Sequence, residues 1–198
     1  MADAALKLPP PMTVAEFVDW PGDVPGLSYE LVDGVPRAMA PARDVHGTIH
    51  TNLASRIDSH LEKTRPEHRL VTAPGIQPRL RAEWNYRIPE LGVTCTPNTS
   101  DAVMMPDPLL LIEVLSPGNA DDTWGNIALY STIPSVQEIL VVHSTAVKAE
   151  LLRRASDRSW PENPVIIDDI GAAVQLNTID LLLPMAAIYR NTHLLAQG

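Results

Sequence analysis

The feature that most constrains this chain is the nine-residue run Leu109-Leu110-Leu111-Ile112-Glu113-Val114-Leu115-Ser116-Pro117. Seven of the nine residues are apolar or proline, which is typical of a strand buried on both faces of a sheet. Glu113 stands inside this run, and a carboxylate is almost never fully buried without a partner because its desolvation is costly. Two interpretations of the segment stay open: a salt-bridged Glu at a strand end, and a metal-binding carboxylate in a nuclease-type core.

Composition places the chain among ordinary globular proteins. Its 198 residues, 45% hydrophobic and 20% charged, predict a single domain over 12–198, preceded by a disordered lead-in over 1–11. A single cysteine, Cys95, excludes an internal disulfide framework. No apolar run approaches the roughly 20 residues that a membrane helix needs, and no signal peptide is evident. We therefore expect a cytoplasmic protein without a membrane segment.

The net charge of −9 argues against strong nonspecific binding to nucleic acid, because phosphate contacts require Lys and Arg. It does not exclude a nuclease, since a local basic strip can coexist with an acidic body and metal-binding carboxylates add negative charge themselves.

Periodicity and turn signals predict an α/β domain, described equally as an α+β mixed sheet with helices on both sides. A helix is expected over 13–20, opened by a capping box of Thr13 and Glu16, and another over 46–63, where apolar residues recur every four positions from Ile49 to Leu61. A third helix is expected after a cap at Asp121 or Asp122, and a last one over 183–189 with Pro184 early in the helix. Strands are expected over 28–32 and 35–39, joined by a hairpin turn at Asp33-Gly34, and over 87–95, 109–115, 138–142, 147–154, 165–167 and 173–176. Between them, 70–72 and 76–80 are expected to form two short strands or one strand with a bulge. The strand over 147–154 is expected to be half-exposed, with Glu150 on its polar side.

Three carboxylates stand on successive predicted strands: Glu30, Glu90 and Glu113. By itself Glu30 is interpreted as an edge position. Carboxylates that converge from neighbouring strands bind Mg²⁺ or Mn²⁺, which prefer oxygen ligands. His46 and His50 are one helical turn apart and could chelate a metal, but no HExxH glutamate accompanies them, so two surface histidines are the favoured interpretation.

Several motifs occur in an order that resembles a known family. They are Met12-Thr13-Val14-Ala15-Glu16-Phe17, Tyr29-Glu30-Leu31-Val32-Asp33-Gly34, His46-Gly47, Pro106-Asp107-Pro108 through Glu113-Val114-Leu115-Ser116-Pro117, Tyr130, and Ile133-Pro134-Ser135. In this order and spacing the chain resembles the Uma-type restriction endonuclease family, of the PD-(D/E)XK nuclease superfamily. The resemblance runs from about Met12 to Tyr189.

The resemblance implies a restriction-endonuclease-like core, a central mixed β-sheet flanked by helices. It implies a divalent metal, Mg²⁺ or Mn²⁺, held by Glu90 and Glu113, with Glu30 and His46 as further catalytic positions. Two departures stand out. Glu90 replaces the family's usual Asp, and Asn126 occupies the position of the family's lysine, four residues before Tyr130.

Three function hypotheses follow. The first is a metal-dependent endonuclease acting on DNA phosphodiester bonds through Glu30, Glu90, Glu113, Asn126 and His46, with its competence limited by the missing lysine. The second is a catalytically degenerate family member that retains only nucleic-acid or protein binding. The third, glycoside hydrolysis, has only the paired carboxylates in its favour. DNA is the expected partner, and a homodimer is suggested by analogy with nucleases that cut both strands.

Overall fold

The computed structural model describes residues 10–39, 43–118 and 120–195. The predicted lead-in therefore lies largely outside the described residues. The helices are α1 (Val14–Asp19), α2 (Asp44–Thr64), α3 (Ala120–Tyr130), α4 (Met185–Ile188) and a short 3₁₀ helix, η1 (Ala82–Trp84). The strands are β1 (Tyr29–Val32), β2 (Val35–Ala38), β3 (Arg69–Thr72), β4 (Leu91–Thr94), β5 (Leu110–Leu115), β6 (Glu138–His143), β7 (Ala149–Arg153), β8 (Val165–Ile167), β9 (Ala173–Leu176) and β10 (Leu181–Pro184).

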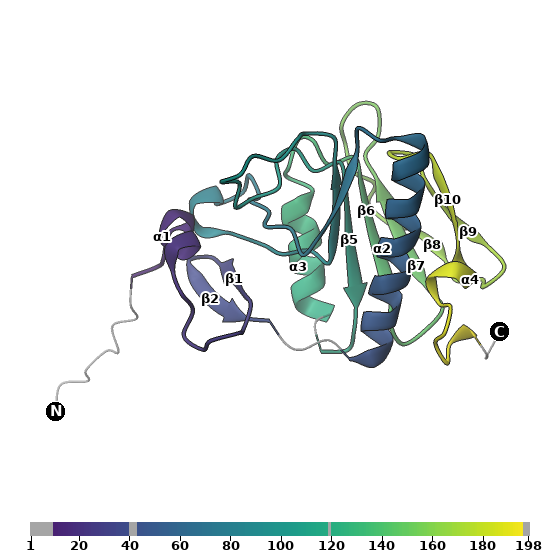
Figure 1. The fold of residues 1–198 in the computed structure, drawn as a ribbon, viewed down its shortest axis with the longest axis horizontal. Coiled ribbons are helices and arrows are strands. Elements are labelled where there is room, and N and C mark those ends of the chain that lie inside the picture. The colour runs from purple at the N-terminus through teal and green to yellow at the C-terminus, as the bar shows by residue number, and fades with distance from the viewer. Residues whose placement is uncertain (1–9, 40–42, 119, 196–198) are drawn as a thin grey trace.

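A mixed sheet forms the centre of the molecule. Among the described residues it has six strands in the order β3-β4-β5-β6-β7-β8, in which β5 and β6 are parallel and the other neighbours are antiparallel. The parallel pair is connected through α3, and Figure 1 shows α2 and α3 on opposite sides of β5. The predicted α/β fold with a mixed sheet and helices on both sides is thus confirmed.

Each face of the sheet carries its own apolar core. On one face, the stripe Ile49, Leu53, Ile57 and Leu61 of α2 packs with residues of β5 and β6 such as Ile112 and Leu140. On the other face, Ile127 and Tyr130 of α3 pack with Leu111, Leu115 and Val141. All six residues of β5 are buried, so the apolar run is a strand covered on both faces, as predicted. Because side chains alternate along a strand, Glu113 shares the α3 face with Leu111 and Leu115.

The β1–β2 hairpin and α1 lie beside α3, at the opposite end of the molecule from β9, β10 and α4 (Figure 1). The predicted capping box of α1 is present, since the Thr13 hydroxyl accepts from Glu16 N and the Glu16 carboxylate accepts from Thr13 N. The Asp33-Gly34 turn closes the hairpin, and an isolated bridge between Leu31 and Tyr86 ties it to the segment before β4.

Several local predictions were wrong. Over 76–80 only Ile76 forms a bridge, to Arg87, so no strand develops there. Asp121 and Asp122 lie inside α3 rather than at its cap. The final helix is shorter than predicted because Leu181–Pro184 pairs with β9, and Pro184 is the N-cap of α4. Glu150 was predicted on the polar, exposed side of its strand. It is buried, because that side of β7 faces the rest of the protein.

Within the described residues, no helix is long and apolar enough to cross a membrane.

Candidate functional site

Glu113 is a buried carboxylate in the middle of the sheet. It is 5% exposed, and its Oε1 accepts a hydrogen bond of 2.8 Å from the hydroxyl of Tyr130 on α3. Burial raises the pKa of the Glu113 carboxyl well above its usual value; the Tyr130 hydroxyl lowers it, and the Glu30 and Glu90 carboxylates raise it again. In the described part of the chain no Lys, Arg or His forms an ion pair with Glu113. The salt-bridge interpretation of this residue is therefore wrong.

Glu90 lies immediately before β4 and meets the start of α2. Its Oε1 is 2.6 Å from His46 Nε2, and its backbone carbonyl is 3.2 Å from His50 Nε2. Its backbone N–H also lowers the pKa of Glu113, so the loop that carries Glu90 reaches the Glu113 carboxylate. The interpretation of His46 as a surface residue was wrong, because the residue is 6% exposed and its side chain is directed at Glu90.

Glu30 projects from β1 toward α3 and the segment before β4. Its Oε1 accepts a 2.6 Å hydrogen bond from the backbone N–H of Ile88, and its Oε2 lies 3.7 Å from a terminal nitrogen of Arg87. Burial raises the pKa of the Glu30 carboxyl; Ile88, Arg87 and a hydrogen bond from the Asn126 side chain oppose that rise. The carboxylate is partnered inside the protein, unlike the exposed edge position that Glu30 alone suggested.

Asn126 is a buried residue of α3, one turn before Tyr130. Its amide interacts with Glu30, while Tyr130 contacts Glu113. Two consecutive turns of one helix therefore contact two of the predicted carboxylates. The side chain at position 126 is neutral, so α3 brings no charge to them there.

The structure thus gathers Glu30, Glu113 and Asn126 on the α3 side of the sheet, with Glu90 and its partner His46 adjoining them. Among the described residues, no group of three or more His, Cys, Asp and Glu side chains is arranged so that it could hold a metal ion. Mg²⁺ is, however, commonly bound through only one or two carboxylates and several waters. Glu113, which has no cationic partner among the described side chains, and Glu90 match that donor chemistry.

Two residues near these carboxylates were not assigned a role from sequence. Tyr130 is fully buried, and its position one helical turn after Asn126 is the sequence signal that could identify it as a neighbour of the site. Arg87 is 7% exposed and pairs with Glu30. Its place three residues before Glu90 was visible, but no local pattern reveals that an arginine will be buried.

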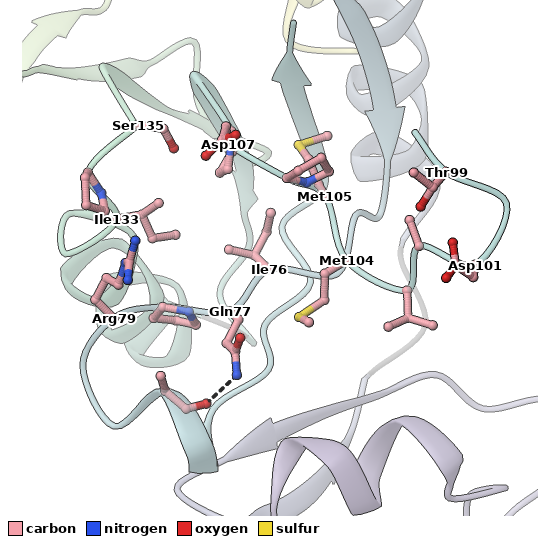
Figure 2. Close-up of a pocket in the computed structure, with 17 residues that line it drawn as sticks. Ile76, Gln77, Arg79, Thr99, Asp101, Met104, Met105, Asp107, Ile133 and Ser135 are labelled. Carbon is pink, nitrogen blue, oxygen red and sulfur yellow. Dashed lines mark hydrogen bonds between the residues drawn. The ribbon is translucent and has the colours of Figure 1, made fainter. Parts of the chain in front are cut away.

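A separate cavity of about 620 Å³ lies at the opposite end of β5, where loops 76–82, 99–108 and 133–135 meet. Figure 2 shows Met104, Met105 and Ile76 between Thr99 and Asp101 on one side and Ile133 and Ser135 on the other. The Gln77 amide donates to the carbonyl of Ala82 at 2.9 Å. None of the five predicted site residues lines this cavity.

Comparison with known proteins agrees with the motif order. The model of the Uma2 family, described as "Putative restriction endonuclease", matches residues 14–185. An uncharacterized protein of Synechocystis sp., slr1290, is 27% identical over 183 residues, covering 91% of this chain and 93% of that protein. A crystal structure from Anabaena variabilis, described as a "putative nuclease belonging to DUF820", superposes with a TM-score of 0.69 at 17% identity, covering 90% of this chain and 98% of the other. At that identity the structural likeness concerns the fold.

Proposed function

The chain belongs to the Uma2 family, and from that premise we propose that it is a divalent-metal-dependent endonuclease that hydrolyses phosphodiester bonds in DNA. The observation that carries the proposal is the buried carboxylate of Glu113. The Glu30 and Glu90 carboxylates are close enough to raise its pKa, and it has no cationic partner among the described side chains. Such a group is costly to keep for packing alone. A bound cation would offset that cost.

Glu113 and Glu90 would hold Mg²⁺ or Mn²⁺ in this proposal. When bound, the metal supplies an activated water and stabilises negative charge on the phosphoryl group. The chain's own residues orient the ligands. The Tyr130 hydroxyl donates to Oε1 of Glu113, and Glu90 lies between two histidines, with Oε1 2.6 Å from His46 Nε2 and Oε2 3.8 Å from His50 Nε2.

Glu30 and Asn126 occupy the side of the site next to α3. Glu30 accepts a hydrogen bond from the Ile88 backbone N–H, and in this proposal it helps to hold the metal or its water. Asn126 can donate a hydrogen bond to a water or a phosphate oxygen, but it supplies no charge. We therefore expect slow cleavage by the natural chain.

The neutral side chain at position 126 favours a second candidate function, binding of nucleic acid or protein without catalysis. The two proposals differ in what restoring a positive charge does. If the site is otherwise competent, Asn126→Lys adds a charge beside Glu30 and stabilises the transition state.

Nicking of supercoiled plasmid in Mn²⁺, with EDTA as the blank, tests the proposal. We expect Asn126→Lys to raise the cleavage rate by roughly 100-fold, the effect of one well-placed charge-stabilising group. Glu113→Gln should abolish cleavage. The matched control is Glu150→Gln, the same change at a buried glutamate of β7, which should cleave at the wild-type rate. No cleavage by either wild type or Asn126→Lys would refute the nuclease proposal and leave the binding-only function.

DNA as the partner, a homodimer and a cytoplasmic location complete the proposal. Sedimentation of the purified protein with and without a DNA duplex tests the first two.

A further inference from the structure

Arg87 is a buried cation beside the candidate site. A pair of backbone hydrogen bonds with Ile76, each 2.8 Å, fixes its main chain. One terminal nitrogen donates to Asn85 Oδ1 at 3.0 Å, and the other lies 3.7 Å from Glu30 Oε2. The main chain of Arg87 is thus fixed by Ile76, and its guanidinium is contacted by Asn85 and Glu30.

These contacts leave Arg87 incompletely satisfied. Its Nε is buried and has no hydrogen-bond partner among the residues that the structure describes. The separation of 3.7 Å from Glu30 is also longer than a charge-assisted hydrogen bond, which is about 2.7–2.9 Å. A buried donor without an acceptor destabilises the folded protein, because the donor has lost its hydrogen bonds to water. The contacts among the described residues therefore do not satisfy every donor of the Arg87 guanidinium.

Arg87 and Asn126 line the same cavity, of about 340 Å³, which lies between the β1–β2 turn and α3. The other charged residues of its wall already have partners: Asp33 is 3.0 Å from Arg81, and Asp122 is 3.5 Å from Arg37. Cavities of this size accept a small ligand or a fragment of a larger one. Among the described residues that line this cavity, Arg87 is the buried cation, and the planar arrangement of N–H donors on its guanidinium matches the geometry of phosphate oxygens.

We propose that Arg87 binds a backbone phosphate of DNA in this cavity and brings to the site the positive charge that α3 does not supply at position 126. The inference rests on the proposed function, because it takes the substrate to be DNA. Arg87 would then contact the substrate directly, with Glu30 as the group that positions its guanidinium.

Binding tests this inference separately from cleavage. The probe is a fluorescein-labelled 20-base-pair duplex in EDTA, measured by anisotropy over a range of salt concentrations and repeated with a second, unrelated sequence. We expect Arg87→Gln to weaken both duplexes by about tenfold and to reduce the slope of log K against log[salt] by about 1, as loss of one phosphate contact does. Arg87→Lys keeps the charge and should retain the slope.

Arg153→Gln is the matched control, because Arg153 also pairs with a buried glutamate, Glu138 at 2.7 Å, but on β7 and away from the cavity. Its salt slope should equal that of wild type. Since Arg87→Gln removes the cation beside the buried Glu30 carboxylate, the single variant could unfold. The double variant Glu30→Gln/Arg87→Gln removes both charges and keeps the binding measurement interpretable in that case.

Asn126→Lys combined with Arg87→Gln should recover the slope, because both side chains face the same cavity. A wild-type salt slope in Arg87→Gln, or no duplex binding by wild-type protein, overturns the inference. The nuclease proposal fails on a different result, the absence of cleavage by both wild type and Asn126→Lys. Reduced binding in Arg87→Gln therefore supports a phosphate contact even if no variant cuts DNA.

Discussion

Replacing Tyr130 with Phe removes one oxygen from the core and nothing else. The ring of Tyr130 is fully buried among the side chains between α3 and the sheet, so its packing is conserved in the variant. What is lost is the 2.8 Å hydrogen bond to Glu113 Oε1. The change therefore measures how much the fold depends on holding this carboxylate.

The expected cost follows from the charge of the acceptor. A hydrogen bond to a charged group contributes about 1.5–3 kcal/mol to stability, and one to a neutral group about 0.5–1.5 kcal/mol. Tyr130→Phe should therefore cost about 1.5–3 kcal/mol when Glu113 is ionised and less in the Glu113→Gln background. For a chain of this length the larger cost lowers the midpoint of thermal unfolding by roughly 3–12 °C.

Burial raises the pKa of Glu113, so the folded protein holds the protonated form to higher pH than the unfolded chain does. Stability from this group is present below the unfolded pKa and is lost as pH rises through the folded pKa. The ionised fraction grows over the same range, and the cost of Tyr130→Phe should grow with it.

Urea unfolding of wild type, both single variants and the double variant, in EDTA at about pH 6 and pH 8.5, gives the coupling energy at each pH. Equal costs of Tyr130→Phe in the wild-type and Glu113→Gln backgrounds would show that the hydroxyl does not act through the Glu113 carboxylate. A cost that falls as pH rises would refute the assignment of the Tyr130 hydroxyl as a group that lowers the pKa of Glu113.

Two further predictions concern polar side chains outside the candidate site. Burial alone would raise the pKa of Glu150, but hydrogen bonds from Lys148 and His143 outweigh burial and hold the pKa below its usual value. The stability that these bonds provide is present above the unfolded pKa and is lost as pH falls through the folded pKa. Glu150→Gln should therefore flatten the decline in folding stability that acid titration measures below about pH 4.5. Asn52 donates to the carbonyls of Ile188 and Arg190 at 2.9 and 2.7 Å, and Asn52→Leu, which leaves both without this donor, should cost about 1–3 kcal/mol in urea unfolding, whereas a cost near zero would show that α4 does not depend on this anchor.

Local chemistry accounts for the parts of the fold that the sequence predicted well. The four-residue repeat from Ile49 to Leu61 predicted α2, and Thr13 with Glu16 predicted the capped start of α1. The Asp33-Gly34 turn predicted the hairpin. These signals act between residues at most a few positions apart, so no tertiary contact is needed to produce them.

Predictions failed where the structure of one segment depends on its packing against a segment that is distant in the sequence. Pro184 suits the first turn of a helix, yet Leu181–Pro184 pairs with β9 because a hairpin buries Leu183. Alternation along β7 suggested a polar, exposed side, but His143 and Lys148 both bond to Glu150 there and allow it to be buried.

The candidate site divides in the same way. The sequence by itself determined that Glu113 lies in a buried strand, because an apolar run bounded by prolines has few other structures available to it. Only the tertiary structure decided its surroundings: Tyr130 as its donor, His46 turned inward to Glu90 from 44 positions away, and Glu30 held by Ile88 from 58 positions away. The periodicity of apolar residues predicts which side chains are buried, whereas the partner of a buried charge depends on which helices and loops pack over it.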